Sequence, residues 1–496
     1  MLFNSQIFVL LFFPVVFLGY YGFHKCDAHK VAKGWLLLAS LVFYAYQHAS
    51  YLILLTGSIA VNYLIYLFFK RTEKDDQKIR LRKMILSAGI IGNLATIFYF
   101  KYYNFFINNV NSLFHTSLHT KKILLPLGIS FFTFQQISFL IDTYRGECGE
   151  YDLLDYSLFV SFFPQLVAGP IVLHKDLIPQ FSQKERFKIQ EDRLIVGLRY
   201  FVIGLAKKLL IADRFGRIAD AGYAAPSGWD SVSGALIILS YTLQIYYDFS
   251  GYSDMAIGLG KILGFDIPMN FDSPYKAASI AEFWKHWHMT MTRFFTQYVY
   301  IPLGGSRKGR FRTCLNVMIV FTLSGLWHGA AWTFVFWGML HGVAQVFHRM
   351  FKEKIERLPR VIRGTVTFVF VNIAWVFFRA EGFRQAKDIL KGLVFGGFQG
   401  VKDGRVAGLL TQFCGDSLNL LLVNMPGAET WLTPVTVICA LLAIFCIVLY
   451  TFLGKSSHEI AKDLTVRKGS GICWGILFAI TVLSLMKVST FLYFNF

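Results

Sequence analysis

A histidine lies at a depth in this chain where a titratable side chain requires an explanation. His328 belongs to the stretch SGLWHGAAW at 324–332, inside an apolar run over residues 314–342. Counted from Arg312 at about 1.5 Å per helical residue, it would lie roughly 24 Å along a helix that crosses about 30 Å of hydrocarbon. Ionisable groups at that depth usually face a protein interior or a water-filled cavity. His328 is therefore either a functional residue that can accept a proton or a neutral imidazole bonded to a neighbouring helix.

A second histidine shares one face of a predicted helix with aromatic residues. Over residues 282–305, Trp284, His288, Met291 and Phe295 follow the spacing i, i+4, i+7, i+11, whereas His286 lies off that face. This spacing leaves two interpretations open. His288 is either an interfacial anchor of a membrane-surface helix or a functional imidazole.

Carboxylates and hydroxyls gather in the stretch DFSGYSD at 248–254. Paired carboxylates can serve acid–base chemistry or bind a metal. No carboxylate and histidine cluster is spaced to complete a metal site, so no metal is expected. Helix capping and the lining of a substrate pocket remain as two interpretations. The second makes Asp248, Ser250 and Tyr252 candidate substrate-binding residues.

A basic turn comes directly before the run that holds His328. Residues 306–312 include Arg307, Lys308, Arg310 and Arg312. Cations in a short loop are sufficient to set the topology of a membrane protein. Binding of phosphate groups by Arg307 and Lys308 is a further hypothesis that topology does not require.

The composition is that of a membrane protein with many spans. Hydrophobic residues make up 55% of the 496 residues, charged residues make up 16%, and the net charge is +19. Soluble globular proteins have about 25% charged residues. The basic residues fall in short loops between apolar runs, which is the positive-inside pattern and argues against a nucleic-acid partner. The seven cysteines form no Cys-x-x-Cys pair and are expected to be packing residues.

The charged loops predict a topology. Apolar runs at about 2–22, 34–49, 51–69 and 84–101 are separated by basic loops at 25–33 and 70–83 and by a loop at 47–51 without Lys or Arg. If the basic loops are cytoplasmic, the N-terminus and the stretch 104–120 are extracytoplasmic. The first run is expected to be a retained helix rather than a signal peptide. The chain is predicted to be a single all-α membrane domain over 1–496, with eleven to thirteen transmembrane or re-entrant helices around a central cavity.

One membrane segment carries two prolines. Residues 156–173 include Pro164, Gly169 and Pro170. Such a segment is expected to be kinked or broken, and a broken helix is tolerated where protein or water satisfies the freed backbone groups. The segment is therefore predicted to line a cavity.

Several motifs give the chain a family resemblance. The stretches that carry it are FWKHWH at 283–288, YIPLGG at 300–305, LWHG at 326–329 and WGMLHG at 337–342. They resemble the membrane-bound O-acyltransferase family. Four more stretches resemble its bacterial alginate O-acetylation branch: SFFTFQ at 130–135, IDTYRG at 141–146, FPQLVAGP at 163–170 and DFSGYSD at 248–254. The motifs occur in order over about residues 1–380, and the best-matching core is about 125–380. The family more often has Arg at the position of His286.

The resemblance implies roles for the two histidines. It makes His328 the catalytic base and His288 a second catalytic residue, which orients the acceptor or donates to the developing oxyanion. Trp284 and Trp327 would line the substrate site, where aromatic rings keep out water that would hydrolyse the thioester. His341 is expected to be a packing residue.

The resemblance also implies a reaction and its partners. An acyl group, most simply acetyl, would pass from a cytosolic thioester toward an extracytoplasmic polysaccharide. The donor would be acetyl-CoA or another acyl thioester such as an acyl-carrier protein, with no bound cofactor. The acceptor side would involve a serine-esterase-type acetyltransferase and an exopolysaccharide, such as alginate, or a cell-wall glycan. The expected location is a bacterial cytoplasmic membrane, in contact with lipid. A multi-helix transporter and a non-catalytic scaffold of a polysaccharide-secretion complex are the alternatives.

Overall fold

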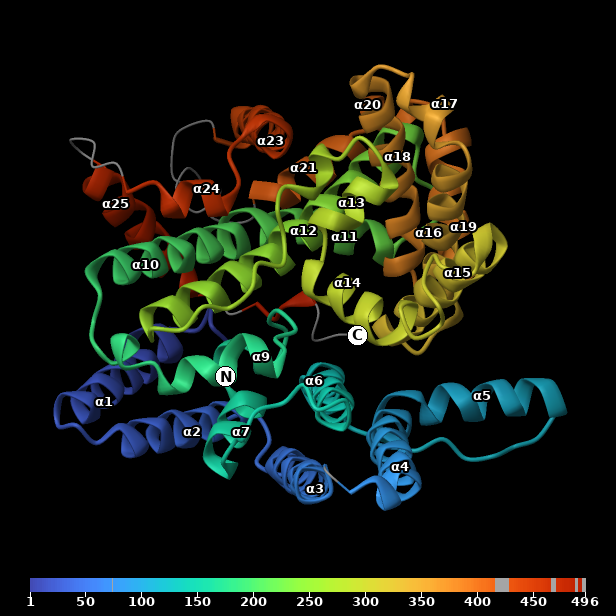
Figure 1. Cartoon of the computed structure of the whole chain (residues 1–496). Coiled ribbons are helices and arrows are strands. Elements are labelled where there is room, and N and C mark those ends of the chain that lie inside the picture. Colours follow the sequence, from blue (N-terminus) through green and yellow to red (C-terminus); the bar gives the residue numbers. More distant parts are fainter. Residues whose placement is uncertain (74, 415–427, 465–469, 487–488, 493–496) are drawn as a thin grey trace.

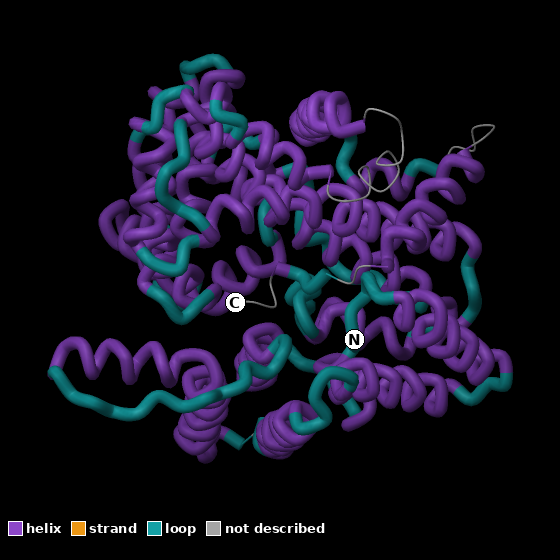
Figure 2. Tube along the Cα trace, turned by 180° about the vertical axis from the view of Figure 1, so that it is seen from behind, coloured by secondary structure: helices purple, strands orange, loops and turns teal. Residues whose placement is uncertain are grey.

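The protein is built from helices. The computed structural model describes residues 1–73, 75–414, 428–464, 470–486 and 489–492. Over these residues every regular element is a helix and no strand is present (Figure 2). The all-α prediction is therefore confirmed. The extent of the single predicted domain over 1–496 stays a prediction.

In Figure 1 the N-terminal helices, in blue, lie along one side of the molecule, and most helices from the middle and the end of the chain lie along the other. The N-terminal group comprises η1 (Phe8–Phe12), α1 (Phe13–Lys25), α2 (His29–Ala45), α3 (Tyr51–Arg71), α4 (Ile79–Ile97), η3 (Phe98–Tyr102), α5 (Tyr103–Phe114), α6 (Ile129–Tyr144) and α7 (Leu153–Ser161). Next come α8 (Phe163–Leu166), α9 (His174–Leu177), α10 (Glu191–Ala206), α11 (Asp213–Ala224), α12 (Ser231–Ile262), α13 (Ile280–His286) and α14 (Met289–Phe295). The C-terminal group comprises α15 (Gly309–His328), α16 (Trp332–Met350), α17 (Lys352–Glu356), α18 (Arg360–Arg379), α19 (Phe383–Phe395), α20 (Gln399–Lys402), α21 (Arg405–Cys414), α23 (Ala428–Leu453), α24 (Ser457–Lys462) and α25 (Ser470–Leu483).

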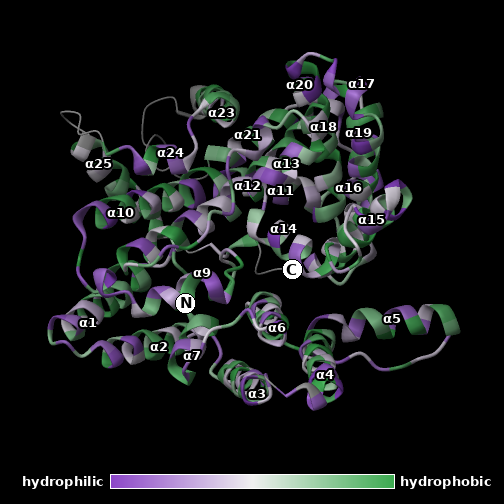
Figure 3. Ribbon diagram, in the orientation of Figure 1, coloured by the Kyte–Doolittle hydropathy of each residue, from purple (hydrophilic) through white to green (hydrophobic). Residues whose placement is uncertain are grey.

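Five helical stretches of the described chain are long and apolar enough to cross a membrane. They are Phe8–Lys25, Tyr51–Arg71, Ile79–Phe114, Arg360–Arg379 and Thr433–Leu453. Figure 3 shows hydrophobic residues along α23 and hydrophilic ones at α17 and α20. Helices such as α12 and α15 are equally long but carry polar side chains that are buried inside the protein, which lowers their hydropathy. The larger number of spans predicted from the sequence includes helices of this second kind.

Glycines allow α10 and α12 to pack closely. A Cβ atom added at Gly204 would lie 2.5 Å from the carbonyl oxygen of Gly251, and one at Gly258 would lie 2.6 Å from that of Gly197. Small residues of this kind let helix backbones approach each other in membranes. The helix α12 is buried along most of its length as a result.

The apolar run at 314–342 is a helical hairpin rather than one membrane span. The helix α15 ends at His328, Gly329 is extended with φ −162° and ψ 154°, and α16 begins at Trp332. A side chain at Gly329 would overlap the ring of Phe334, since an added Cβ lies 2.1 Å from it. The turn therefore needs glycine, and it places His328 at the carboxyl end of a helix instead of inside one.

The helix predicted over the aromatic stripe of residues 282–305 is broken, and that prediction is wrong. The helix α13 ends at His286, Trp287 is extended, and His288 adopts a left-handed conformation with φ 45° before α14 begins. A loop around Asn270 pairs with this break, because the Met289 N–H donates to the Asn270 carbonyl (3.0 Å) and the Asp272 N–H donates to the His286 carbonyl (3.0 Å). The loop satisfies backbone groups that a continuous helix would have paired internally.

The break predicted in residues 156–173 is present. The helix α7 ends at Ser161, Phe162 leaves the helical conformation with ψ 108°, and Pro164 is the second residue of the one-turn helix α8. Val167, which follows α8, lines a cavity next to α15. The break at the prolines thus places Val167 in the same cavity as Trp327, near the end of α15.

Candidate active site

The two candidate catalytic histidines face each other inside the protein. His328 at the end of α15 is 3% exposed and His288 at the start of α14 is fully buried. Their ring centroids lie 6.3 Å apart. Both rings contact the indole of Trp327, at 4.9 Å from His328 and 6.0 Å from His288. Residues forty positions apart in the sequence therefore form one site.

Asn270 orients the ring of His288. The N–H (3.3 Å) and hydroxyl (2.9 Å) of Thr290 both donate to Oδ1 of Asn270, which identifies that atom as the amide oxygen. Nδ1 of His288 lies 3.1 Å from the same oxygen, so Nδ1 carries the proton. In the neutral ring Nε2 then carries the lone pair. These contacts also stabilise the left-handed backbone of His288, which costs about 1 to 2 kcal/mol for a residue other than glycine.

Aromatic rings surround His328. Its ring contacts Trp337 of α16 at 5.1 Å and Phe378 of α18 at 5.2 Å, both edge-on. Trp337 is fully buried. Rings in these positions exclude water from the imidazole.

The N-terminal half of the chain reaches the site through a stack of rings. Trp327 stacks on Phe134 of α6 at 5.2 Å, and Phe134 stacks on Phe294 of α14 at 4.1 Å. Offset-stacked pairs of this kind are each worth about 0.5 to 1.5 kcal/mol. The SFFTFQ stretch that contains Phe134 thus positions the indole between the two histidines.

Trp284 and His341 form a separate buried pair. Nε1 of Trp284 donates to Nδ1 of His341 at 3.2 Å, and His341 is fully buried. Trp284 also contacts Trp337 with ring centroids 5.9 Å apart. His341 therefore orients a tryptophan that packs near the His328 site, which agrees with the packing role expected from the sequence.

An apolar cavity of about 880 Å³ adjoins the site. Trp284, Met291 and Ser324 line it, and Ser324 lies one turn before His328 in α15. Lys285 and Arg349 also line it, and these two cations are shared with a second, charged cavity of about 1320 Å³. The charged cavity adds His286, His348 and Lys352 to its lining, together with the carboxylates of Glu282 and Glu356. We refer to the two as the apolar cavity and the charged cavity, and together they run from a charged surface to Ser324, one turn before His328.

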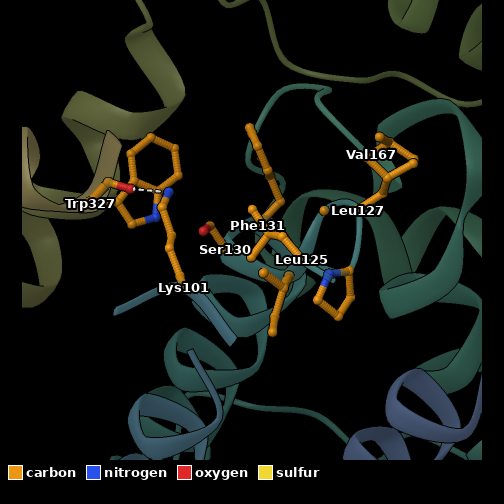
Figure 4. Close-up of a pocket in the computed structure, with 10 residues that line it drawn as sticks. Lys101, Leu125, Leu127, Ser130, Phe131, Val167 and Trp327 are labelled. Atoms are coloured by element: carbon orange, nitrogen blue, oxygen red, sulfur yellow. Dashed lines mark hydrogen bonds between the residues drawn. The ribbon is translucent and has the colours of Figure 1, made fainter. Parts of the chain in front are cut away.

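A third cavity lies beside Trp327. It has a volume of about 430 Å³ and is lined by Lys101, Ser130, Phe131, Val167 and Trp327, among others (Figure 4). We refer to it as the Lys101 cavity. Trp327 lines the Lys101 cavity, and its ring contacts both histidines. The indole therefore lies between this cavity and the imidazoles.

The predicted residues of α12 lie away from these cavities. Asp248 accepts from Nζ of Lys208 (2.7 Å) and from the Leu492 N–H (2.9 Å), and Ser250 accepts from Nζ of Lys207 (3.2 Å). Tyr252 packs against Phe3 (4.8 Å) and Phe491 (4.9 Å). None of the three is among the lining residues of the three cavities. Their substrate-binding role stays a prediction.

The predicted phosphate-binding pair is also apart from the cavities. Arg307 and Lys308 are exposed in the turn before α15 and do not line the apolar or the charged cavity. Lys285 and Arg349 are the cations that line both. Sequence reasoning passed over Arg349 and over Asn270, and the signal for Asn270 was an amide side chain in the apolar stretch 267–271.

The site combines two buried histidines with an apolar cavity and a charged cavity nearby. A family model described as MBOAT, the membrane-bound O-acyltransferase family, matches residues 134–382. The chain belongs to this family and is a membrane-bound O-acyltransferase, a multi-pass membrane protein.

Individual relatives are more specific. The chain is 38% identical to the peptidoglycan O-acetyltransferase of Helicobacter pylori, over 100% of this chain and 98% of the relative. It is 40% identical to a probable alginate O-acetylase of Pseudomonas aeruginosa, over 78% of this chain and 73% of that protein. A teichoic acid D-alanyltransferase of Bacillus subtilis is 24% identical over 60% of this chain. The first two relatives are named as O-acetylating proteins.

Proposed function

We propose that the protein transfers an acetyl group from a cytosolic thioester to an extracytoplasmic polysaccharide. The observation that carries the proposal is the pair His288 and His328, buried 6.3 Å apart between rings that exclude water. The membership of the acyltransferase family supports the reaction class. The names of the two O-acetylating relatives support acetyl as the group that is moved.

The chemistry assigns one task to each histidine. His328 accepts the proton of the acceptor hydroxyl while the oxygen attacks the thioester carbonyl carbon. The carbonyl oxygen becomes an oxyanion, which needs a donor in the dry site. His288 can orient the acceptor, because its Nδ1 donates to Asn270 and its Nε2 can then accept from a second hydroxyl of the glycan. When the intermediate collapses, the C–S bond breaks, and the proton held by His328 passes to the leaving thiolate.

The donor enters through the charged and apolar cavities in this proposal. Lys285 and Arg349 line both cavities and carry charges that suit the phosphates of coenzyme A or the acidic surface of an acyl-carrier protein. The apolar cavity beyond them reaches Ser324, where a thioester would lie close to His328. No bound cofactor is needed for this chemistry.

The acceptor is a cell-wall glycan or an exopolysaccharide. The match to the peptidoglycan O-acetyltransferase covers the whole chain, whereas the match to the alginate O-acetylase covers 78% of it. This difference favours a cell-wall glycan over alginate. The family resemblance further suggests that a serine-esterase-type acetyltransferase outside the membrane takes the acetyl group and passes it to the glycan.

The direction of transfer follows from the topology. In a bacterial cytoplasmic membrane with the N-terminus extracytoplasmic, the loop at 115–125 faces outward and α17 faces the cytosol. A cysteine at Ser117 should react with a membrane-impermeant reagent on intact cells, and one at Glu353 should react only after lysis, in a background without the native cysteines. The opposite pattern would reverse the direction of transfer.

A direct test uses membrane vesicles with acetyl-CoA labelled in the acetyl group. The wild-type protein should consume the thioester and place label in envelope glycan, and His328→Ala at equal abundance should do neither. A transporter would move label without thioester cleavage. A scaffold would allow full glycan labelling in His328→Ala, and either result would refute the proposal.

A further inference from the structure

The end of α15 is bonded by side chains from a distant part of the chain. Nζ of Lys101 donates to the carbonyls of Trp327 (2.7 Å) and His328 (3.0 Å), and Figure 4 shows the first of these bonds. The neighbouring hydroxyl of Tyr102 donates to the carbonyl of Leu326 at 2.6 Å. Three successive carbonyls, the last of them that of His328, are therefore bonded by two adjacent residues of η3.

Without Lys101 and Tyr102 these carbonyls would lack hydrogen-bond donors. The last four carbonyls of an α-helix have no intrahelical donor, and they carry a partial negative charge. Many helices end in a left-handed glycine that satisfies them. Gly329 is instead extended, so the backbone after α15 does not make that cap. Lys101 and Tyr102 take over this function.

No acidic partner explains the lysine. Within the part of the chain that the structure describes, no carboxylate lies within 4.0 Å of Nζ of Lys101. The side chain is half-buried in a mainly apolar helix and lines the Lys101 cavity. Placing an ammonium there is costly unless strong acceptors surround it. The carbonyls at the negative end of α15 are such acceptors.

Lys101 and Tyr102 lie in one of the several π-helical segments of the described chain. The segment η3 is a π-helix between α4 and α5, which change direction there (Figures 1 and 2). Short π-helical turns in α-helices are frequent at functional sites. In this turn two consecutive side chains, those of Lys101 and Tyr102, both bond the end of α15.

We propose that Lys101 is a positioning residue for His328, with Tyr102 as its partner. The inference rests on the proposed role of His328 as the base. The ammonium acts through the main chain: it fixes the last peptide groups of α15, and these set where the imidazole and the Trp327 indole lie. Lys101 does not take part in the proton transfer. Its loss should lower the rate of transfer and leave donor binding intact.

The test measures the kinetics of acetyl transfer in purified membranes for three variants. Lys101→Met keeps the length of the side chain and removes the charge, so kcat should fall about 10- to 100-fold, since small displacements of a catalytic group have effects of this size. The KM for acetyl-CoA should stay within about twofold, because the cavities at Lys285 and Arg349 are unaffected. Lys101→Arg should restore part of the kcat. Tyr102→Phe should give a smaller loss.

Lys121→Met is the matched control. Lys121 lies on the exposed return loop after α5, with its ammonium over the rings of Tyr99 and Tyr103. The Lys121→Met variant should retain wild-type kinetics. An unchanged kcat in Lys101→Met would overturn the inference, as would a loss that only follows the amount of folded protein. If wild-type vesicles and His328→Ala vesicles behave alike, the proposed function itself fails, which is a different result.

Discussion

Two regions of this protein carry the residue types of an active site, and their side chains are held in place by different contacts. The histidines at 288 and 328 both contact Trp327, which lines the Lys101 cavity, although neither histidine lines a cavity itself. They are held by neutral contacts: an amide oxygen for His288 and aromatic rings for His328. The acidic stretch of α12 is held by opposite charges instead. Lys207 pairs with Asp254 (2.7 Å), and Lys208 pairs with Asp248 (2.7 Å) and Asp213 (2.9 Å).

The difference concerns what holds each reactive group in place. Asp248 and Asp254 each accept from a lysine ammonium. A buried imidazole with a fixed tautomer keeps a lone pair that can take a proton. The α12 carboxylates are held in an ion-pair network, whereas Asn270 fixes the tautomer of His288. The roles of both sets of residues stay predictions.

The largest effect is expected at His328. His328→Ala and His328→Gln should both lower acetyl transfer by about two to four orders of magnitude, because neither side chain can take the proton. His341→Gln is the control and should keep most of the activity, because an amide oxygen can still accept from Trp284. Label in envelope glycan, normalised to protein abundance, measures all three. If Gln restores what Ala loses, His328 has a structural role.

A smaller loss is expected at Asn270. Asn270→Ala removes the acceptor that sets the tautomer of His288, so kcat should fall about 10- to 100-fold at similar abundance. Asn62→Ala is a suitable comparison, since Asn62 is also buried and bonds Asn93 (2.8 Å), far along the chain from the site. That variant should change stability and leave kcat unchanged. Equal kcat in both variants would remove Asn270 from the site.

Substitutions in the charged cavity are expected to change binding of the donor rather than the rate of transfer. Charge reversal in Arg349→Glu should raise the KM for acetyl-CoA about fivefold to tenfold, because one contact to a phosphate group is lost. The kcat should change little. Arg307→Glu and Lys308→Glu carry the same charge change at residues outside the cavities. Steady-state kinetics of the three variants will distinguish them: a larger KM increase at Arg307 than at Arg349 would restore the interpretation reached from the sequence.

The smallest effect on turnover is expected at Asp248. Asp248→Asn and Lys208→Met each leave part of a buried charge network uncompensated, which costs about 3 to 5 kcal/mol of stability. The amount of folded protein in detergent should fall, whereas the activity of each remaining molecule should not. An inactive Asp248→Asn protein at normal abundance would instead make Asp248 a substrate-binding residue.

The sequence was sufficient for the class of fold and the class of enzyme, and the catalytic roles of the two histidines stay a prediction. Charge, hydropathy and motif order predicted an all-helical membrane acyltransferase, because these are properties of local sequence. The spacing of Trp284, His288, Met291 and Phe295 indicated a continuous helix, and this was wrong because a loop from Asn270 pairs with the break. Local periodicity does not report backbone hydrogen bonds made by another segment.

The supporting residues were not predictable in the same way. Lys101 and His328 are 227 positions apart, and Asn270 and His288 are 18 apart. Neither pair has a spacing that a helix or turn would bring together. A lysine near the end of an apolar run is also the usual sign of a membrane boundary, so Lys101 had an ordinary explanation until its carbonyl partners were known.

The two ends of the described chain meet inside the protein. Asn4 donates to the Ser489 carbonyl (2.8 Å), and the Leu492 N–H and the Thr490 carbonyl bond Asp248 and Lys208. Residues 489–492 leave the ribosome after the rest of these helices. Until these residues are synthesised, Asp248 of α12 and Lys208 of η6 (Lys207–Ala212) lack these hydrogen-bond partners. Loss of residues 489–492 is therefore expected to lower the amount of assembled protein.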